Sequence, residues 1–160
     1  LDMYVATADE SKLRQALGEY GDCIKDLAAA NIFPGDLMLK NFGVTRFGRV
    51  IFYDYDEIAY LTDCRFRTMP KARHDDEELA SEPWFSVDQN DVFPEQFPTF
   101  LLPPGKPRTI FCEIHGDLAE ASFWIGRQEK IRAGDLDEAA PYPDSIRFER
   151  KYAPRLESPK

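Results

Sequence analysis

The fold of this sequence is decided by one stretch, Gly35–Asp56, which reads GDLMLKNFGVTRFGRVIFYDYD. Apolar residues on both sides of Phe47-Gly48 predict a β-hairpin with strands over 37–45 and 49–54. Upstream, apolar positions recur at helical spacing from residue 11 to residue 30. Either Asp9 or Ser11 fits the N-cap of this helix, and Pro34 prevents its continuation. The sequence therefore predicts a helix that leads into a hairpin.

The acidic and amide residues of this stretch have a spacing that phosphoryl transfer requires. Asp36 is followed by four residues and then Asn41, and the predicted hairpin ends at Asp54. In protein kinases one carboxylate with this spacing orients the attacking hydroxyl, while an amide and a second carboxylate hold magnesium. The alternative is a plain hairpin with polar residues on its solvent face, because such a spacing also arises by chance.

The turn at Phe47-Gly48 sets which residues of the hairpin face each other. A two-residue turn places Asn41 opposite Asp54, so that both proposed ligands meet across one rung. The opposite face then becomes the core face; it comprises Phe42, Val44, Ile51 and Tyr53. A three-residue loop would shift this register by one, and Phe-Gly is not a preferred two-residue turn.

The rest of the chain predicts less regular structure. Residues 62–106 carry many prolines and predict loops with short helical pieces, covered by aromatic side chains: Trp84, Phe85, Phe93, Phe97 and Phe100. A second helix is expected over 107–133, ending near Gly134. Its expected buried stripe is Ile110, Phe111, Ile114, Leu118, Ala121 and Ile125. Residues 135–160 predict an extended tail.

Composition limits the classes of function. The 160 residues carry 20 Lys and Arg against 29 Asp and Glu, a net charge of −9. This balance argues against sequence-independent nucleic-acid binding, which needs cations to neutralise phosphates. The apolar runs are too short to cross a membrane. Three widely spaced cysteines favour reduced thiols in a cytoplasmic protein over disulfides or a zinc site.

The sequence resembles the bacterial bifunctional isocitrate dehydrogenase kinase/phosphatase family over nearly its whole length. The resemblance is carried by Asn31–Asp36, Lys40–Arg46, Gly48–Val50 and Phe52–Ile58. Further matching segments are Ser81–Trp84, Asn90–Pro94 and His115–Leu118. These runs are far more specific than the kinase spacing alone.

The resemblance implies roles for individual residues. Asp36 corresponds to the catalytic aspartate, and Asn41 and Asp54 correspond to the magnesium ligands of an ATP site. Asp56 stands where ordinary kinases have the glycine of Asp-Phe-Gly, and we expect it to position water for dephosphorylation. Lys40 either supplies a cation to the site or, by strand parity, faces away from it.

The resemblance also implies a fold and partners. The expected fold is α+β, a mostly helical protein-kinase-like C-terminal lobe over residues 1–134. The implied protein substrate is isocitrate dehydrogenase, phosphorylated and dephosphorylated on serine at the branch point between the citric acid cycle and the glyoxylate bypass. We expect a homodimer of a longer protein, with no nucleic acid or membrane partner. No glycine-rich loop precedes Asp36, so we expect little independent catalysis. A non-catalytic interaction domain is the alternative.

Four other features carry weaker functional hypotheses. His115-Gly116-Asp117-Leu118 imitates the catalytic loop of small-molecule phosphotransferases, but its position in a predicted helix favours a structural role. His74 beside the acidic residues 75–78 is expected to form a solvated face rather than a metal site. Arg65 and Arg67 either meet an acidic surface or belong to an ordinary exposed strand. The cysteines Cys23, Cys64 and Cys112 are expected to be buried and unreactive.

Overall fold

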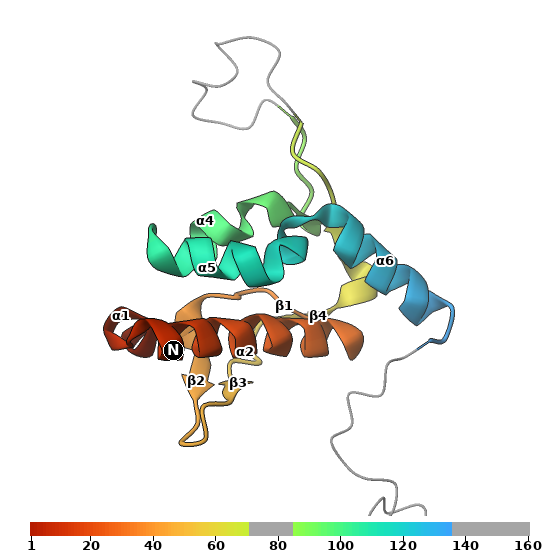
Figure 1. Ribbon diagram of the computed structural model, residues 1–160. Helices are drawn as coiled ribbons and strands as arrows, with labels where there is room; N and C mark the ends of the chain where they lie inside the picture. Colours follow the sequence, from red (N-terminus) through yellow and green to blue (C-terminus); the bar gives the residue numbers. More distant parts are fainter. Residues whose placement is uncertain (71–84, 136–160) are drawn as a thin grey trace, which may run out of the picture.

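The structure is a computed structural model that describes residues 1–70 and 85–135. It is an α+β arrangement of helices and small two-stranded sheets, as the sequence predicts (Figure 1). The helices are α1 (Asp2–Thr7), α2 (Glu10–Ala29), α4 (Phe97–Leu101), α5 (Lys106–His115) and α6 (Ala121–Arg132). The strands are β1 (Ile32–Pro34), β2 (Phe42–Val44), β3 (Val50–Phe52), β4 (Ile58–Tyr60), β5 (Arg65–Phe66) and β6 (Asp91–Val92). Short 3₁₀ turns are η1 (Leu39–Asn41), η2 (Leu61–Asp63), η3 (Pro94–Gln96) and η4 (Gly116–Ala119).

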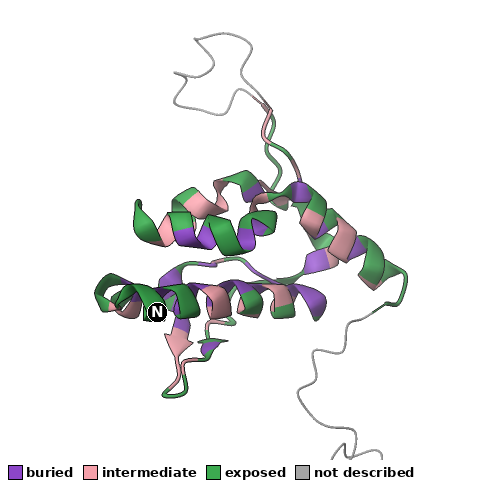
Figure 2. Cartoon of the chain, viewed as in Figure 1, coloured by how far each residue is buried: buried purple, intermediate pink, exposed green. Residues whose placement is uncertain are grey.

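Helix α2 confirms the prediction from the apolar periodicity. The Asp9 side chain accepts a hydrogen bond from the Lys12 N–H at 3.0 Å and so caps the helix. Asn31 follows the helix with φ of 61°, a left-handed conformation that asparagine tolerates and that ends helices. The apolar stripe of α2 faces the interior (Figure 2). Its buried members include Leu13, Leu17, Tyr20, Ile24 and Ala28.

Helix α2 packs mainly against α5, and one glycine permits this close approach. A Cβ atom at Gly21 would lie 2.1 Å from the imidazole ring of His115. The His115 Nε2 atom is 2.9 Å from the Gly18 carbonyl oxygen, which completes the contact. His115 is therefore a buried packing residue between two helices, consistent with the structural role expected for its segment.

The single helix predicted over 107–133 is wrong. The chain leaves α5 at His115, passes through η4 and begins a new helix at Ala121. The Trp124 Nε1–H donates a hydrogen bond to the Leu118 carbonyl at 2.9 Å, which joins the two sides of the break. One straight helix would bury Ile114 and Ile125, but these side chains are 37% and 40% exposed. The break instead buries Leu118 and Trp124 together.

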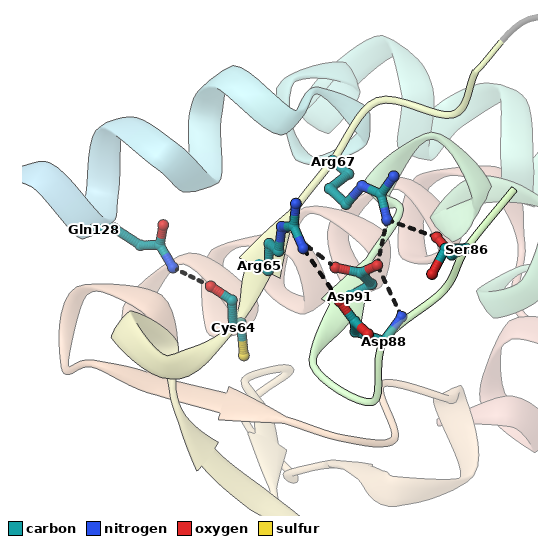
Figure 3. A network of polar contacts seen from close by, with 7 residues as sticks. All are labelled: Cys64, Arg65, Arg67, Ser86, Asp88, Asp91 and Gln128. Carbon is teal, nitrogen blue, oxygen red and sulfur yellow. Dashed lines mark hydrogen bonds and ion pairs between the residues drawn. The ribbon is translucent and has the colours of Figure 1, made fainter.

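An aromatic cluster around Trp124 joins α6 to the strands. The Trp124 ring stacks on Phe66 of β5 and meets Phe33 of β1 and Phe97 of α4 edge-on. The buried Gln128 side chain donates to the carbonyls of Leu61 and Cys64, at 2.6 and 2.8 Å. Of the aromatic side chains predicted to cover residues 62–106, Phe97 joins this cluster, whereas Phe100 is 69% exposed. The pairing of β5 with β6 was not predicted (Figure 3).

The β2–β3 hairpin was predicted, but its register is shifted by one residue. Phe42 pairs with Phe52 and Val44 with Val50, so Asn41 faces Tyr53 rather than Asp54. The loop has three residues, Arg46–Gly48, because Gly48 adopts φ of 79°.

The shifted register also changes the core face of the hairpin. Phe42, Val50 and Phe52 are buried, whereas Ile51 and Tyr53 are 50% and 56% exposed. The expectation that Ile51 and Tyr53 belong to the core is therefore wrong, because a one-residue shift moves a side chain to the other face.

The remaining predictions concern membrane-spanning helices and the C-terminal part of the chain. No helix within 1–70 or 85–135 has both the length and the apolar character needed to cross a membrane. The extended tail expected over 135–160 lies almost entirely outside the described residues, as do Trp84, His74 and the acidic residues 75–78. Helix α6 ends at Arg132, and Gly134 follows with φ of 80°, which confirms the predicted helix end.

Candidate active site

Two loops meet where the paired strands end. One loop leaves β1 at Gly35 and enters β2 at Phe42; the other leaves β3 at Tyr53 and enters β4 at Ile58. Because β1 pairs antiparallel with β4, and β2 with β3, both ends of one loop lie beside both ends of the other. The Gly35 N–H donates to the Glu57 carbonyl at 2.6 Å, which fixes this junction.

The first loop is held in place by the core. The Tyr20 hydroxyl, buried in α2, donates to the Leu37 carbonyl. On the other side, the Tyr53 hydroxyl donates to the Lys40 carbonyl. Helix α2 and strand β3 therefore determine the position of Asp36, which lies between these two anchors in the same loop.

The loops enclose an acidic cavity of about 230 Å³. Its lining contains four carboxylates and one ammonium group: Asp36, Lys40, Asp54, Asp56 and Glu57. Asp36 and Asp54 are half-buried, whereas Asp56 and Glu57 are exposed. Such an excess of carboxylates over ammonium groups repels itself, and a cation bound in the cavity relieves that repulsion.

Asp36 is hydrogen-bonded as a carboxylate. Its Oδ1 atom accepts from the Met38 N–H at 2.9 Å, and its Oδ2 atom lies 3.2 Å from the Lys40 Nζ atom. Burial raises the pKa of Asp36, but the Met38 hydrogen bond and Lys40 outweigh burial and hold the pKa below its usual range. Asp36 is therefore charged at neutral pH and oriented by its own loop.

Lys40 faces the site, contrary to the strand-parity argument. That argument assumed a strand from residue 37 onward, but Leu39–Asn41 form the 3₁₀ turn η1. Because of this turn, the Lys40 side chain reaches Asp36, four residues earlier in the sequence, and forms an ion pair with it.

Asn41 lies beside Asp36 without lining the cavity. It is 5% exposed, and its Nδ2 atom donates to the Asp36 carbonyl at 3.1 Å. This bond uses the amide nitrogen and fixes the orientation of the side-chain oxygen. The prediction that Asn41 and Asp54 meet on one rung is wrong, because the rung partner of Asn41 is Tyr53.

The donor set fits a magnesium ion. Magnesium prefers oxygen ligands, and proteins hold it with one or two carboxylates while substrate phosphates and water complete the shell. Asp54, which lines the cavity, is a ligand of this kind, whereas Asn41 is buried beside the cavity and does not line it. Among the described residues there is no group of three or more His, Cys, Asp or Glu that would form an all-protein cage.

Glu57 was missed at the sequence level. It lines the cavity because β1 pairs with β4, a pairing of three-residue strands that carry no alternating pattern. Two short apolar segments, Ile32–Pro34 and Ile58–Tyr60, flank the hairpin region on both sides. This arrangement is the sequence feature that indicates their pairing, and with it the position of Glu57.

The weaker candidates lie elsewhere. Arg65 and Arg67 form ion pairs within the chain, with Asp88 and Asp91. Asp117 pairs with Lys25 of α2 at 2.7 Å.

The cysteines differ from one another in exposure. Burial raises the pKa of Cys23 and of Cys64 to about 11, which makes both thiols unreactive as expected. The expectation of burial is wrong for Cys112, which is exposed, and holds only in part for Cys23 and Cys64, which are half-buried.

Comparison with known proteins decides the family. A family model described as the isocitrate dehydrogenase kinase/phosphatase (AceK) kinase domain matches residues 1–144. The chain belongs to this family. It is 53% identical over 151 residues, 94% of this chain, to the isocitrate dehydrogenase kinase/phosphatases of Yersinia pestis (strain Pestoides F) and of Serratia proteamaculans (strain 568). It is 52% identical over 155 residues, 97% of this chain, to that of Pectobacterium carotovorum subsp. carotovorum (strain PC1). The chain spans 26% of the length of each of these relatives.

Proposed function

We propose that this chain supplies the catalytic carboxylate and the metal ligands of an enzyme that phosphorylates isocitrate dehydrogenase on serine with ATP and removes the phosphate again. The observation that carries the proposal is the shared acidic cavity of Asp36 and Asp54, in a member of the kinase/phosphatase family.

Each residue of the site has a chemical role in this proposal. Asp36 accepts or orients the proton of the serine hydroxyl; its carboxylate is charged at neutral pH and its own loop holds it in place. Asp54 and Asn41 hold magnesium, which when bound neutralises charge on the phosphates. Lys40 holds the Asp36 carboxylate in place and offers a cation to the phosphates of ATP.

Asp56 is assigned to the reverse reaction. Its carboxylate lies in the cavity lining beside Asp54 and is exposed to solvent. It positions the water that attacks the phosphoserine. Asp56→Ala should lower phosphatase activity more than kinase activity, and an unchanged phosphatase rate would remove this role.

The fold supports a kinase-like C-terminal lobe over residues 1–134. The loop between β1 and β2, the hairpin after it and the helix before it follow the order that the kinase spacing implies. The remaining parts of the longer protein would supply the nucleotide clamp, so this chain alone would have little activity. A cytoplasmic homodimer that controls the citric acid cycle and glyoxylate bypass belongs to the same proposal.

The test uses the full-length protein. Asp54→Ala should abolish phosphate transfer from ATP to isocitrate dehydrogenase at every magnesium concentration, because a metal ligand is lost. The matched control is Glu129→Gln, which removes an exposed carboxylate on α6, outside the cavity lining. Wild-type activity in Asp54→Ala would reject the proposal, and so would an equal loss in both variants.

A further inference from the structure

A second cavity lies on the other side of the loop that carries Asp36. It measures about 340 Å³, and its lining includes Gly35 and Leu37 on either side of Asp36 in the sequence. The remaining wall is largely aromatic, with Phe33, Phe93, Phe97 and Phe100. We refer to this cavity as the aromatic groove. Asp36 lines the acidic cavity while its two neighbours line the groove, so a single chain segment separates the two.

The acidic cavity and the aromatic groove lie close enough together for one extended peptide to contact both. An extended chain advances about 3.3–3.6 Å per residue, so a serine at Asp36 has its sequence neighbours within reach of the groove. The apolar lining excludes the phosphates of a nucleotide and favours an apolar side chain. The rim residue Phe100 is 69% exposed, a large apolar surface for contact with a partner.

One wall of the groove is fixed by a buried carboxylate. Asp91 of β6 has a fully enclosed side chain that accepts from Arg67, which follows β5, and from the Asp88 N–H (Figure 3). The Asp88 N–H, with Arg67 and Arg65, holds the pKa of Asp91 below its usual range. These bonds hold β6, and with it Val92 and Phe93, in the groove wall.

One carboxylate oxygen of Asp91 has an ion-pair partner but no hydrogen bond. Its Oδ1 atom is 3.7 Å from the Arg65 Nε atom and has no hydrogen-bond partner among the residues described. Because the Asp91 side chain is enclosed, this oxygen interacts with the Arg65 guanidinium and is not accessible to a ligand. The groove lining is therefore mainly apolar, and the role of Asp91 is to fix β6 in its wall.

We propose that the aromatic groove binds an apolar side chain of the protein substrate, in the residues next to the serine that is phosphorylated. This inference rests on the proposed function and adds a specificity determinant to it. The same contact serves phosphorylation and dephosphorylation, because both reactions bring the same serine to Asp36.

The test compares two exposed phenylalanines in the full-length protein. Phe100→Ser removes an aromatic ring from the groove rim, whereas Phe47→Ser removes one from the hairpin loop, where Phe47 is 74% exposed. Phe100→Ser should raise KM for isocitrate dehydrogenase about tenfold, the size expected for one apolar contact in a pocket. Its kcat should change far less, and KM for phosphorylated isocitrate dehydrogenase should rise in parallel. Phe47→Ser should keep the wild-type values.

A substrate variant makes the test specific. Replacing the apolar residue beside the target serine with Asp should raise KM for the wild-type enzyme, and should raise it much less in Phe100→Ser, because the two changes remove the same contact. Unchanged KM in Phe100→Ser overturns the inference while phosphate transfer is intact. A lower melting temperature with unchanged KM does so too, since it shows that the groove is filled by the protein itself. Absence of Asp36-dependent transfer in the wild-type protein would instead reject the proposed function.

Discussion

The tripeptide Gly-Asp-Leu occurs at residues 35–37, 116–118 and 134–136, and its first two copies have different structural outcomes. In the first copy, Asp36 lies half-buried in a cavity with three other carboxylates. In the second copy, Asp117 lies 46% exposed in the turn between α5 and α6 and pairs with Lys25. The two aspartates have the same neighbours in sequence but different neighbours in space.

The difference between the copies comes from the elements that follow them. After the first copy the chain forms a hairpin and returns alongside β1, which brings Asp54, Asp56 and Glu57 to Asp36. After the second copy the described chain continues into helix α6 and ends beyond it at residue 135. A site of this kind therefore requires a returning chain, which the tripeptide alone does not specify.

The largest expected effect separates the two aspartates directly. Asp36→Asn should lower phosphate transfer to isocitrate dehydrogenase by about 10²–10⁴-fold, the usual contribution of a positioned acid or base. Asp117→Asn should leave the rate within about twofold, because it breaks a partly exposed ion pair worth about 0.2–1 kcal/mol of stability. Initial rates with the full-length variants measure both. Equal losses would show that the two copies do not differ in function.

The second prediction compares the two glycines. A Cβ atom at Gly35 would lie 2.8 Å from the Glu57 carbonyl oxygen, whereas one at Gly116 would meet no atom within 4 Å. Gly35→Ala should therefore push the two site loops apart and lower kcat by about 10²-fold, as small misplacements of catalytic groups do. Gly116→Ala should be neutral. An active Gly35→Ala enzyme would contradict the placement of Glu57 beside the first loop.

The third prediction concerns stability at the second copy. His115 precedes Gly116 and fills the space above Gly21. Gly21→Ala should lower the free energy of unfolding by about 1–3 kcal/mol through overpacking. Gly18→Ala, on the same helix with open space around it, should raise that free energy by about 0.5–1 kcal/mol. Denaturant unfolding of both variants measures the contrast, and a stable Gly21→Ala would show that the α2–α5 contact is looser than described.

The smallest expected effect is a shift with pH. Lys40 helps to hold the pKa of Asp36 below its usual range, so Lys40→Met should move the acid limb of the kinase pH–rate profile to higher pH. The depressed pKa stabilises the fold above the pKa of an unfolded aspartate, and this contribution is lost as pH falls through the folded value. Lys40→Met should therefore weaken the fold at neutral pH and leave it unchanged in strong acid. An unshifted acid limb would assign the low pKa to the Met38 hydrogen bond alone.

The sequence predicted the elements that depend on local pattern. Helix α2 follows from its apolar periodicity and its Asp9 cap. Asp36, Asn41 and Asp54 were expected at one site; Asp36 and Asp54 line one cavity, whereas Asn41 does not line it. These features depend on spacing along one segment. The break at Gly116 was not predicted, because the apolar stripe continues through it and only the packing of Trp124 against Leu118 decides it.

The hairpin register and Glu57 depended on information that pattern does not contain. Gly48 adopts a left-handed conformation and lengthens the loop by one residue, which changes every pair in the hairpin. Glu57 reaches the site through pairing of β1 with β4, strands of three residues each. Both outcomes are determined by backbone geometry and by contacts between distant segments rather than by local preference.

The central claim is that Asp36, Asn41 and Asp54 serve one metal-assisted phosphate-transfer site. The most direct test is a crystal structure of the full-length protein with Mn²⁺ and a non-hydrolysable ATP analogue, in which anomalous scattering locates the metal. We expect the manganese peak within coordination distance of Asp54 and of the Asn41 amide oxygen, with the Asp36 carboxylate facing the γ-phosphate. A peak elsewhere in the protein, or oxygens of Asn41 and Asp54 that point away from a common ion, would contradict the account.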